Sequence, residues 1–334
     1  MDTPTSKFHQ IEWDQVLHVP WSPSDSVQTP GSIVESLTSI EAEEDDILAS
    51  RPGTTTSTAF QPGGNIYHLP SDTVLVSLDL VCFHVHSELL LIVSENRLNS
   101  LLPPFNWEQC IPTQSPPRQT YIDVPEHSQI LNIILHVAYG MSVTPYAPTF
   151  DMLSEALNRL TVYGIEPKIA LASSSAFHST LMMHAPLNPI ALYTLASKHD
   201  CFELAASTST FLLSHRVENM TDVTAGNIGP VYLARLFSLQ GMRLTALRQL
   251  LSTHPQPHSP TPTCDIDSQK SVTKAWMLAS AYLIWQSKPD MSPSQIDSVL
   301  RSLSTHAPCQ LCKQGLNQRT DSVVHNWKQV RKTI

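Results

Sequence analysis

The sequence predicts an α+β protein in which a small three-stranded sheet is capped by helices and followed by a mostly helical C-terminal domain. Two short segments rich in β-branched residues adjoin one turn within 72–87, and a third such segment follows at 120–125. From residue 128 onward, apolar residues recur at helical spacing. Only 10 of the 334 residues are glycine, against 26 prolines, so few segments are suited to binding phosphate in a glycine-rich loop.

The first two strands are predicted in TVLVSLD, which begins at Thr73, and in VCFHVHS, which begins at Val81. Apolar residues at helical spacing then predict one helix through 87–102. Five prolines within 103–119 indicate a loop or insertion, because proline interrupts both helices and strand ladders. The third strand, TYIDVP, ends at Pro125.

Capping residues mark the boundaries of the helices that follow. Gly164 is predicted to end a helix, and Asn188-Pro189 combines an N-cap residue with proline at the first helical position. Ser292-Pro293-Ser294-Gln295 is a capping box. The predicted helices include 128–140, 149–164, 201–215, 230–252, 268–286, 293–304 and 318–330.

Charge is distributed unevenly along the chain. Residues 1–60 hold ten acidic and two basic residues, whereas the remaining residues hold 19 acidic and 18 basic ones. Residues 1–66 are also rich in proline, serine and threonine, which predicts a disordered acidic N-terminal tail. The nearly neutral remainder shows no basic face, so nucleic acid is not an expected partner.

Cysteine use and hydropathy predict the compartment. The six cysteines are spread over the chain and do not resemble a disulfide framework, and no secretory signal is visible. The longest apolar stretch is 89–93, far short of the ~20 residues that span a bilayer. We therefore expect an intracellular protein of the cytoplasm or nucleus that makes no membrane contact.

The residues around the first hairpin carry a family resemblance. Asp72 begins the first strand, Phe83 and His86 lie at the end of the second, and Leu90 lies in the helix that follows. This pattern resembles the signature of the BTB/POZ domain, and Ala138-Tyr139-Gly140 is similar to the end of that domain's central helix. The resemblance covers 67–184, including the proline-rich insertion at 103–119.

The rest of the chain, 185–334, resembles the helical C-terminal domain of BTB proteins from mushroom-forming fungi (basidiomycetes). The segments that carry this likeness are GPVYLARLF, TKAWMLASAYLIW and the final WKQVRKTI. A linker rich in proline and histidine, HPQPHSPTPT at 254–263, divides this helical domain.

The resemblance implies a non-catalytic protein–protein interaction protein that acts as an adaptor or an oligomerisation scaffold. Its implied partners are other proteins bound through the BTB domain, including a second copy in a homodimer and a cullin-type ubiquitin ligase. Two features depart from the family. Ser94-Glu95-Asn96-Arg97-Leu98 replaces the usual aromatic-bearing segment, and the acidic tail has no counterpart of the helix and strand that many BTB dimers exchange.

One motif has the spacing of a metal site. In His306-x-x-Cys309-x-x-Cys312, two thiolates can bind one tetrahedral Zn²⁺ with the imidazole as a third ligand. Cys264 is the candidate for a fourth ligand, with His254 or His258 as substitutes. Such a metal would fix the linker to the last helices and contribute folding energy without a catalytic role.

Two other interpretations of the same residues stay open. The cysteines after Pro308 are also compatible with ordinary reduced thiols at the start of a helix. Alternatively, residues 254–334 are a zinc-supported helical sensor or enzyme. The chain contains no Gly-x-Ser-x-Gly, His-Glu-x-x-His or Walker motif, so no catalytic residue and no cofactor other than structural zinc are predicted.

Overall fold

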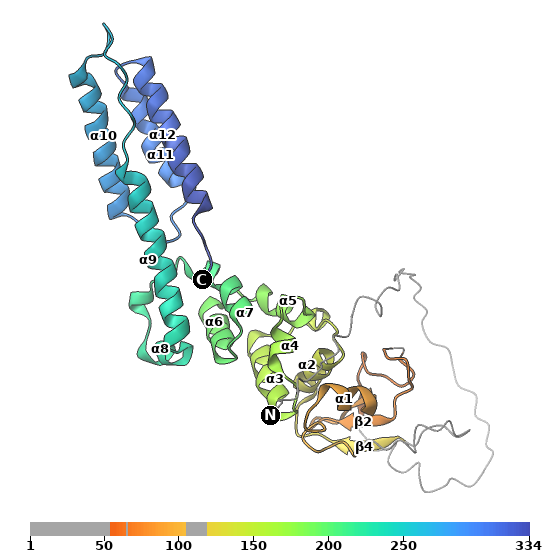
Figure 1. The fold of residues 1–334 in the computed structure, drawn as a ribbon. Coiled ribbons are helices and arrows are strands. Elements are labelled where there is room, and N and C mark those ends of the chain that lie inside the picture. The colour runs from red at the N-terminus through yellow and green to blue at the C-terminus, as the bar shows by residue number, and fades with distance from the viewer. Residues whose placement is uncertain (1–53, 65, 105–118) are drawn as a thin grey trace, which may run out of the picture. The chain divides into compact units, whose positions relative to one another are not determined.

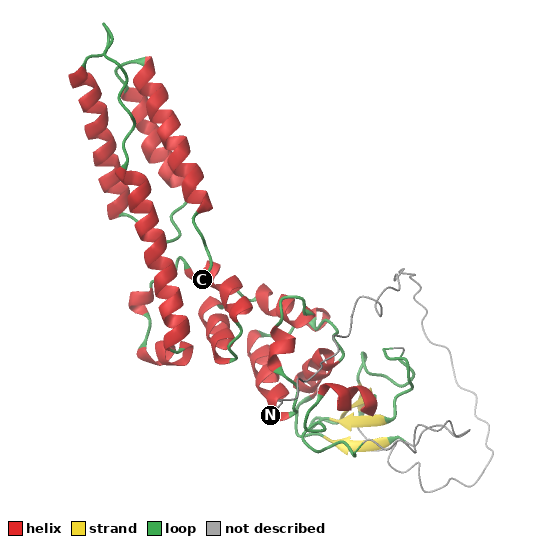
Figure 2. Cartoon of the chain, in the orientation of Figure 1, coloured by secondary structure: helices red, strands yellow, loops and turns green. Residues whose placement is uncertain are grey.

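A computed structural model describes residues 54–334 apart from 65 and 105–118. The described chain forms a small sheet followed by a succession of helices, as Figures 1 and 2 show. The α+β class and the mostly helical C-terminal part are therefore confirmed. Residues 1–53 of the predicted tail and most of the predicted insertion lie outside the described residues.

The described sheet has four strands and not the predicted three. β2 (Thr73–Val76) and β3 (Val81–Val85) form the antiparallel hairpin, and β4 (Thr120–Asp123) pairs with β2 in parallel. A two-residue strand, β1 (Thr55–Thr56), lies parallel to β3 on the opposite side, which gives the order β1-β3-β2-β4.

Phe60 lies in the segment predicted as the N-terminal tail. Its side chain is fully buried, and its ring centroid lies 6.1 Å from that of Phe83 and 5.2 Å from that of Tyr139. Its carbonyl accepts a hydrogen bond from the backbone N–H of His84. Residues 54–64, placed by the sequence in the tail, thus contact the sheet through β1 and through the buried ring of Phe60.

The helix predicted at 87–102 ends much earlier. α1 spans Ser87–Val93, and Ser94 has an extended backbone. The Ser94 hydroxyl donates to the carbonyl of Tyr163 and accepts from the N–H of Leu98, so a local turn replaces the helical ladder. The four residues that follow in this turn, Arg97 to Ser100, all have positive φ.

Gly164 is required where this turn meets the helix α3 (Phe150–Val162). Gly164 has φ +68°, and a Cβ there would lie 2.5 Å from Oδ1 of Asn96. The Asn96 amide in turn donates to the carbonyl of Val162 at 2.8 Å. The predicted helix stop is thus confirmed, and the glycine also leaves room for the neighbouring segment.

The remaining helices follow in sequence. The α-helices are α2 (Ser128–Ala138), α4 (Pro167–Leu171), α5 (Ala176–Met183), α6 (Pro189–Lys198), α7 (Phe202–Ser209), α8 (Asp222–Ile228), α9 (Pro230–Ser252), α10 (Ile266–Trp285), α11 (Pro293–Ser302) and α12 (Gln310–Gln329). Short 3-10 helices are η4 (Thr144–Tyr146), η5 (Thr210–Leu212), η6 (Val217–Asn219) and η7 (Leu303–His306).

Two predicted caps have different outcomes. The Ser292 side chain accepts a hydrogen bond from the N–H of Gln295, which confirms the start of α11. Pro189 is the first residue of α6 as predicted, but the Asn188 side chain makes no capping bond. With ψ at 47°, Asn188 is not in the extended conformation from which a capping side chain reaches the first turn.

The hydrophobic packing does not divide at the predicted boundary of residue 184. The larger core includes the sheet and continues through α6 to Leu236 in the first half of α9. A second core lies among the four helices α9 to α12 and includes Leu247, Trp276 and Trp327. The change from one core to the other therefore falls within α9.

Arg243, buried in the middle of α9, joins this long helix to the end of the chain. Its guanidinium donates to the carbonyls of Pro289, Val330 and Arg331 and lies 4.4 Å from the ring centroid of Trp327. Residue 334 reaches the larger core, where its N–H donates to the Ser209 hydroxyl. The contacts of Arg243 thus hold α9 against the segments before α11 and after α12, and the bond to Ser209 connects the residues after α12 to α7.

Asp79, in the β2–β3 turn, receives hydrogen bonds from the first residue of α2. Its carboxylate accepts from the N–H and the hydroxyl of Ser128 and from the hydroxyl of Ser77. Burial alone would raise its pKa, but the bonds from Ser128 and Ser77 outweigh burial and lower the pKa to about 2. The ionised carboxylate therefore connects the hairpin to a helix N-terminus.

We predict that Phe60→Ala lowers the free energy of unfolding by about 3–5 kcal/mol, the usual cost of truncating a buried phenylalanine. The matched control is Ile92→Ala, because the Ile92 side chain is 68% exposed. Chemical denaturation of the full chain measures both. Equal stability of the Phe60 variant and the wild type would contradict the burial of this side chain.

We also predict a pH-dependent role for Asp79. Because its pKa is lower in the folded chain than in the unfolded chain, its stabilising effect is complete above about pH 5 and is lost as the pH falls from about 4 to 2. The stability difference between wild type and Asp79→Asn, measured by denaturation at each pH, should shrink over that range. A difference independent of pH would contradict a role for the charge.

Candidate metal centre

Three separate segments bring one imidazole and three thiols together at one end of the four-helix bundle. Cys309 and Cys312 lie at the start of α12, Cys264 lies just before α10, and His258 lies in the linker between α9 and α10. Their ligand atoms all lie within 4.8 Å of one another. Cys264 and Cys312 are buried, and the other two side chains are half-buried. This cluster can hold a metal ion.

Cys309 and Cys312 are positioned by the first turn of α12. Cys309 is the N-cap, and its Sγ accepts a hydrogen bond from the N–H of Cys312. The N-cap and the third helical residue lie on the same side of a helix start, so both sulfurs face one point. The helix was predicted to begin at 318, but this cap starts it eight residues earlier, at Gln310.

The linker reaches the cluster by running antiparallel to α12 (Figure 1). The Arg319 guanidinium donates to the carbonyls of Leu250 and Thr253, where the linker leaves α9. Farther along, the carbonyl of Gln256 lies beside Gly315. The linker's prolines limit its backbone freedom before folding, which lowers the entropy lost when it lies along the helix.

Cys264 is held by a tight turn. The N–H groups of Thr261 and Cys264 each donate to the carbonyl of the other residue, at 3.0 and 3.1 Å. Asp265 directly after it caps α10 by accepting from the N–H of Ser268. The thiol therefore lies between a closed turn and a capped helix start.

The interatomic distances fit a tetrahedral centre. Nε2 of His258 lies 3.2 Å from Sγ of Cys309 and 3.3 Å from Sγ of Cys312, and Sγ of Cys264 lies 3.7 Å from Sγ of Cys312. Around tetrahedral zinc, two sulfurs lie about 3.8 Å apart, and a sulfur and a nitrogen about 3.6 Å apart. The sulfur–sulfur distance also excludes a disulfide, whose bond is about 2.05 Å.

The protonation of His258 suits ligation through Nε2. Its Nδ1 lies 2.7 Å from the carbonyl oxygen of Ser259. Because a carbonyl only accepts hydrogen bonds, Nδ1 carries the proton and donates it, which leaves the lone pair of a neutral imidazole on Nε2. Such a second hydrogen bond also fixes the ring orientation of metal-binding histidines.

The three thiols have different acidities. The hydrogen bond from the N–H of Cys312 is the main cause that lowers the pKa of Cys309 to about 7. Burial raises the pKa of Cys312 to about 12 and also raises the pKa of Cys264. A cation at the centre of the cluster would favour the thiolate form of all three.

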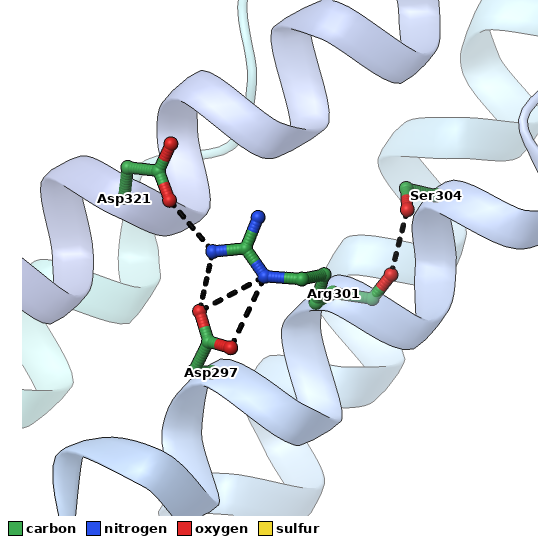
Figure 3. Close-up of polar contacts among 4 residues, drawn as sticks. All are labelled: Asp297, Arg301, Ser304 and Asp321. Atoms are coloured by element: carbon green, nitrogen blue, oxygen red, sulfur yellow. Dashed lines mark hydrogen bonds and ion pairs between the residues drawn. The ribbon is translucent and has the colours of Figure 1, made fainter.

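α11 and α12 are also joined by an ion pair on the surface of the bundle. The Arg301 guanidinium contacts the carboxylates of Asp297 at 2.5 Å and Asp321 at 2.6 Å (Figure 3). The carbonyl of Arg301 accepts from the Ser304 hydroxyl in η7, which leads toward Cys309. These exposed contacts contribute modestly to stability, so the metal cluster is the stronger candidate for holding this end together.

The structure replaces one of the predicted ligands. His306 is absent from the cluster and instead lines a pocket with Leu303 and Pro308, whereas His258, expected only as a substitute, is present. His254 is also absent from the cluster. The reason is the chain direction: η7 ends at His306, and an extended Ala307 follows, so a histidine three residues before Cys309 is not on the helix that carries the cysteines.

The BTB-like signature residues lie together at the sheet and α1. Asp72 accepts hydrogen bonds from the N–H and the hydroxyl of Ser87, the first residue of α1. The backbone N–H of His86 donates to the hydroxyl of Tyr139, which also lies 2.8 Å from Nδ1 of His86. Phe83 and Leu90 are buried in the larger core. These residues connect strand, helix and core.

Comparisons with profiles of known protein families, with curated proteins and with solved structures find no match to this chain. In the part of the chain that the structure describes, no helix combines the length and the apolar character needed to cross a membrane.

We predict that His258→Ala weakens zinc binding by at least about 10–100-fold, because even loss of an outer-shell partner has an effect of that size. His306→Ala is the matched control and should leave the affinity unchanged, because His306 lies outside the cluster. Competition with a chromophoric chelator measures both affinities. A greater loss of zinc affinity in His306→Ala than in His258→Ala would instead support His306 as the ligand, as the sequence spacing predicts.

Proposed function

We propose that this chain is a non-catalytic protein–protein interaction protein in which a BTB/POZ-type domain is followed by a helical bundle held by structural Zn²⁺. The observation that carries the metal assignment is the convergence of His258, Cys264, Cys309 and Cys312 within 4.8 Å. Three thiolates and one imidazole form a donor set typical of structural zinc, and Mg²⁺ or Ca²⁺ would require oxygen ligands.

The ligand number favours a structural role over a sensor or an enzyme built on 254–334. Catalytic zinc keeps a coordination position for water or substrate, whereas four protein ligands fill a tetrahedral shell. The ligands also come from three segments: the linker, the turn before α10 and the start of α12. Metal binding would therefore stabilise the fold directly.

The order of elements supports a BTB/POZ-type domain. An antiparallel hairpin, a short helix, a further strand and two longer helices follow one another in β2, β3, α1, β4, α2 and α3. The contacts of Asp72 with Ser87 and of His86 with Tyr139 join these elements. By the resemblance, the partners of this domain are a second copy or a cullin-type ubiquitin ligase.

Metal analysis of the full chain tests the zinc assignment. The wild type should contain about one zinc per chain, and Cys309→Ser with Cys312→Ser should contain none. At free zinc 100-fold above its Kd, the metal adds about 2.7 kcal/mol to stability, which chelation would remove. Cys201→Ser is the control, because Cys201 lies outside the cluster. Equal metal content in both variants would contradict the site.

Association measurements test the interaction function. Light scattering of the zinc-loaded full chain over a range of concentrations should give twice the mass of one chain, or the chain should bind a purified cullin N-terminal domain. A single-chain mass at every concentration, together with no binding to the cullin domain, would contradict a BTB/POZ-type role.

A further inference from the structure

α10 has an apolar stripe on its outer face. Leu278, Tyr282 and Trp285 are 73%, 49% and 88% exposed, and their spacing places them on one side of the helix. The opposite side of α10 carries Trp276 and Leu283, which are buried in the bundle core. A stripe of this kind, with a tryptophan almost entirely exposed, is typical of a surface that another molecule covers.

A pocket of about 390 Å³ lies at the other end of the same helix. Ser271 and Ala275 line the pocket and lie seven residues, or about two turns, before Leu278 and Tyr282. The pocket therefore continues the stripe toward the start of α10. Most of its lining is apolar, with polar groups at Ser268, Ser271 and His306; the apolar residues are Val272, Ala275, Leu303, Ala307, Pro308 and Leu316.

The charged residues nearest the stripe in the sequence are two lysines, whereas the acidic residues Asp265, Asp267 and Asp290 lie farther along the chain on either side. Residues 275–287 include no charged side chain, and Lys274 and Lys288 flank them. Farther back, Lys270 is already paired with Asp267 at 2.9 Å. The apolar stripe thus lies between two lysines, which attract an acidic partner.

The same charges argue against a second copy as the occupant. If two α10 helices paired in parallel, each lysine would face its own equivalent. If they paired antiparallel about the middle of the stripe, Lys274 of one copy would approach Lys288 of the other. Both arrangements place like charges opposite each other, which disfavours association.

We propose that the pocket and stripe of α10 form a docking surface for an acidic amphipathic helix of another protein. One large apolar side chain of that helix fills the pocket, its apolar face covers Leu278, Tyr282 and Trp285, and its carboxylates face Lys274 and Lys288. From 268 to 285 the surface is about 26 Å long, which matches a partner helix of about 17 residues. This inference rests on the proposed interaction function and assigns to it a second surface outside the BTB-type domain.

The metal cluster also supports the pocket. Ala307 and Pro308 line the pocket and directly precede Cys309, while α10 begins two residues after Cys264. Bound zinc would thus fix two of the segments that line the pocket. Partner binding is consequently weaker in the chelated protein.

A displayed library of random 18-residue peptides, selected against the zinc-loaded full chain, tests the proposal. Enriched peptides should be amphipathic as helices and rich in glutamate or aspartate. Synthetic versions should bind at least 10-fold more weakly to Leu278→Ser with Trp285→Ser. Leu187→Ser with Val223→Ser is the matched control, because these side chains are 83% and 74% exposed and lie outside the docking surface.

Charge reversal then tests the acidic character of the partner. Lys274→Glu with Lys288→Glu should weaken binding of the selected peptides. The same variant should bind more strongly to versions of these peptides in which lysine replaces each acidic residue. Equal binding to all variants, or enrichment of basic or non-amphipathic peptides, would overturn the proposal. So would stripe-dependent self-association in light scattering, or stripe-dependent binding to phosphatidylcholine–phosphatidylserine vesicles.

The metal content and mass of the same samples distinguish failure of the docking surface from failure of the proposed function. A zinc-loaded chain that dimerises or binds the cullin domain, but shows no stripe-dependent peptide binding, would overturn the docking surface and leave the proposed function in place. Stripe-dependent peptide binding by a zinc-loaded chain without either association would support the docking surface and contradict the BTB/POZ-type role.

Discussion

The proposed zinc centre is the constraint on which the far end of the four-helix bundle would depend, because His258, Cys264, Cys309 and Cys312 meet there. The bundle core is small, and the linker that carries His258 crosses its surface without a strand or helix of its own. Arg319 holds the start of this linker, and the cluster holds its end. A metal bound by these four side chains would fix the linker, α10 and α12 together, as metals do in small domains with limited cores.

The metal cluster lies beside the bundle core, whereas the sheet packs in the larger core, and α9 contributes to both cores. We therefore expect changes at the metal cluster and changes at the sheet to affect the stability of different parts of the fold. Leu236 packs in the larger core and Leu247 in the bundle core, about three helical turns apart on the same helix. Arg243 lies between them and donates to the carbonyl of Pro289, before α11, and to that of Val330, after α12. Metal loss is expected to loosen the bundle, whereas Phe60 and Asp79 act on the sheet and α2.

Local patterns in the sequence were sufficient where neighbouring residues decide the structure. The N-cap at Ser292 and the stop at Gly164 are set within one helical turn, and both are confirmed. Cys309 and Cys312 were paired for the same reason. Contacts between distant segments were not predictable: Phe60 is ordered by Phe83 and Tyr139, and the imidazole of the cluster depends on how the linker lies along α12.

The sequence also could not distinguish the two histidines near the cysteines. His306 has the conventional spacing, but the end of η7 places it at the pocket, while His258 reaches the cluster from 51 residues before Cys309. Spacing along the chain predicts a ligand set only when the ligands share one turn or hairpin. Here only two of the four ligands share a turn, so the fold decides the other two.

X-ray absorption spectroscopy at the zinc edge, on the zinc-loaded full chain, tests the central claim most directly. The expected first shell has three sulfurs at about 2.3 Å and one nitrogen at about 2.0–2.1 Å. A shell dominated by oxygen and nitrogen, or one with fewer than three sulfurs, would contradict the four-ligand centre.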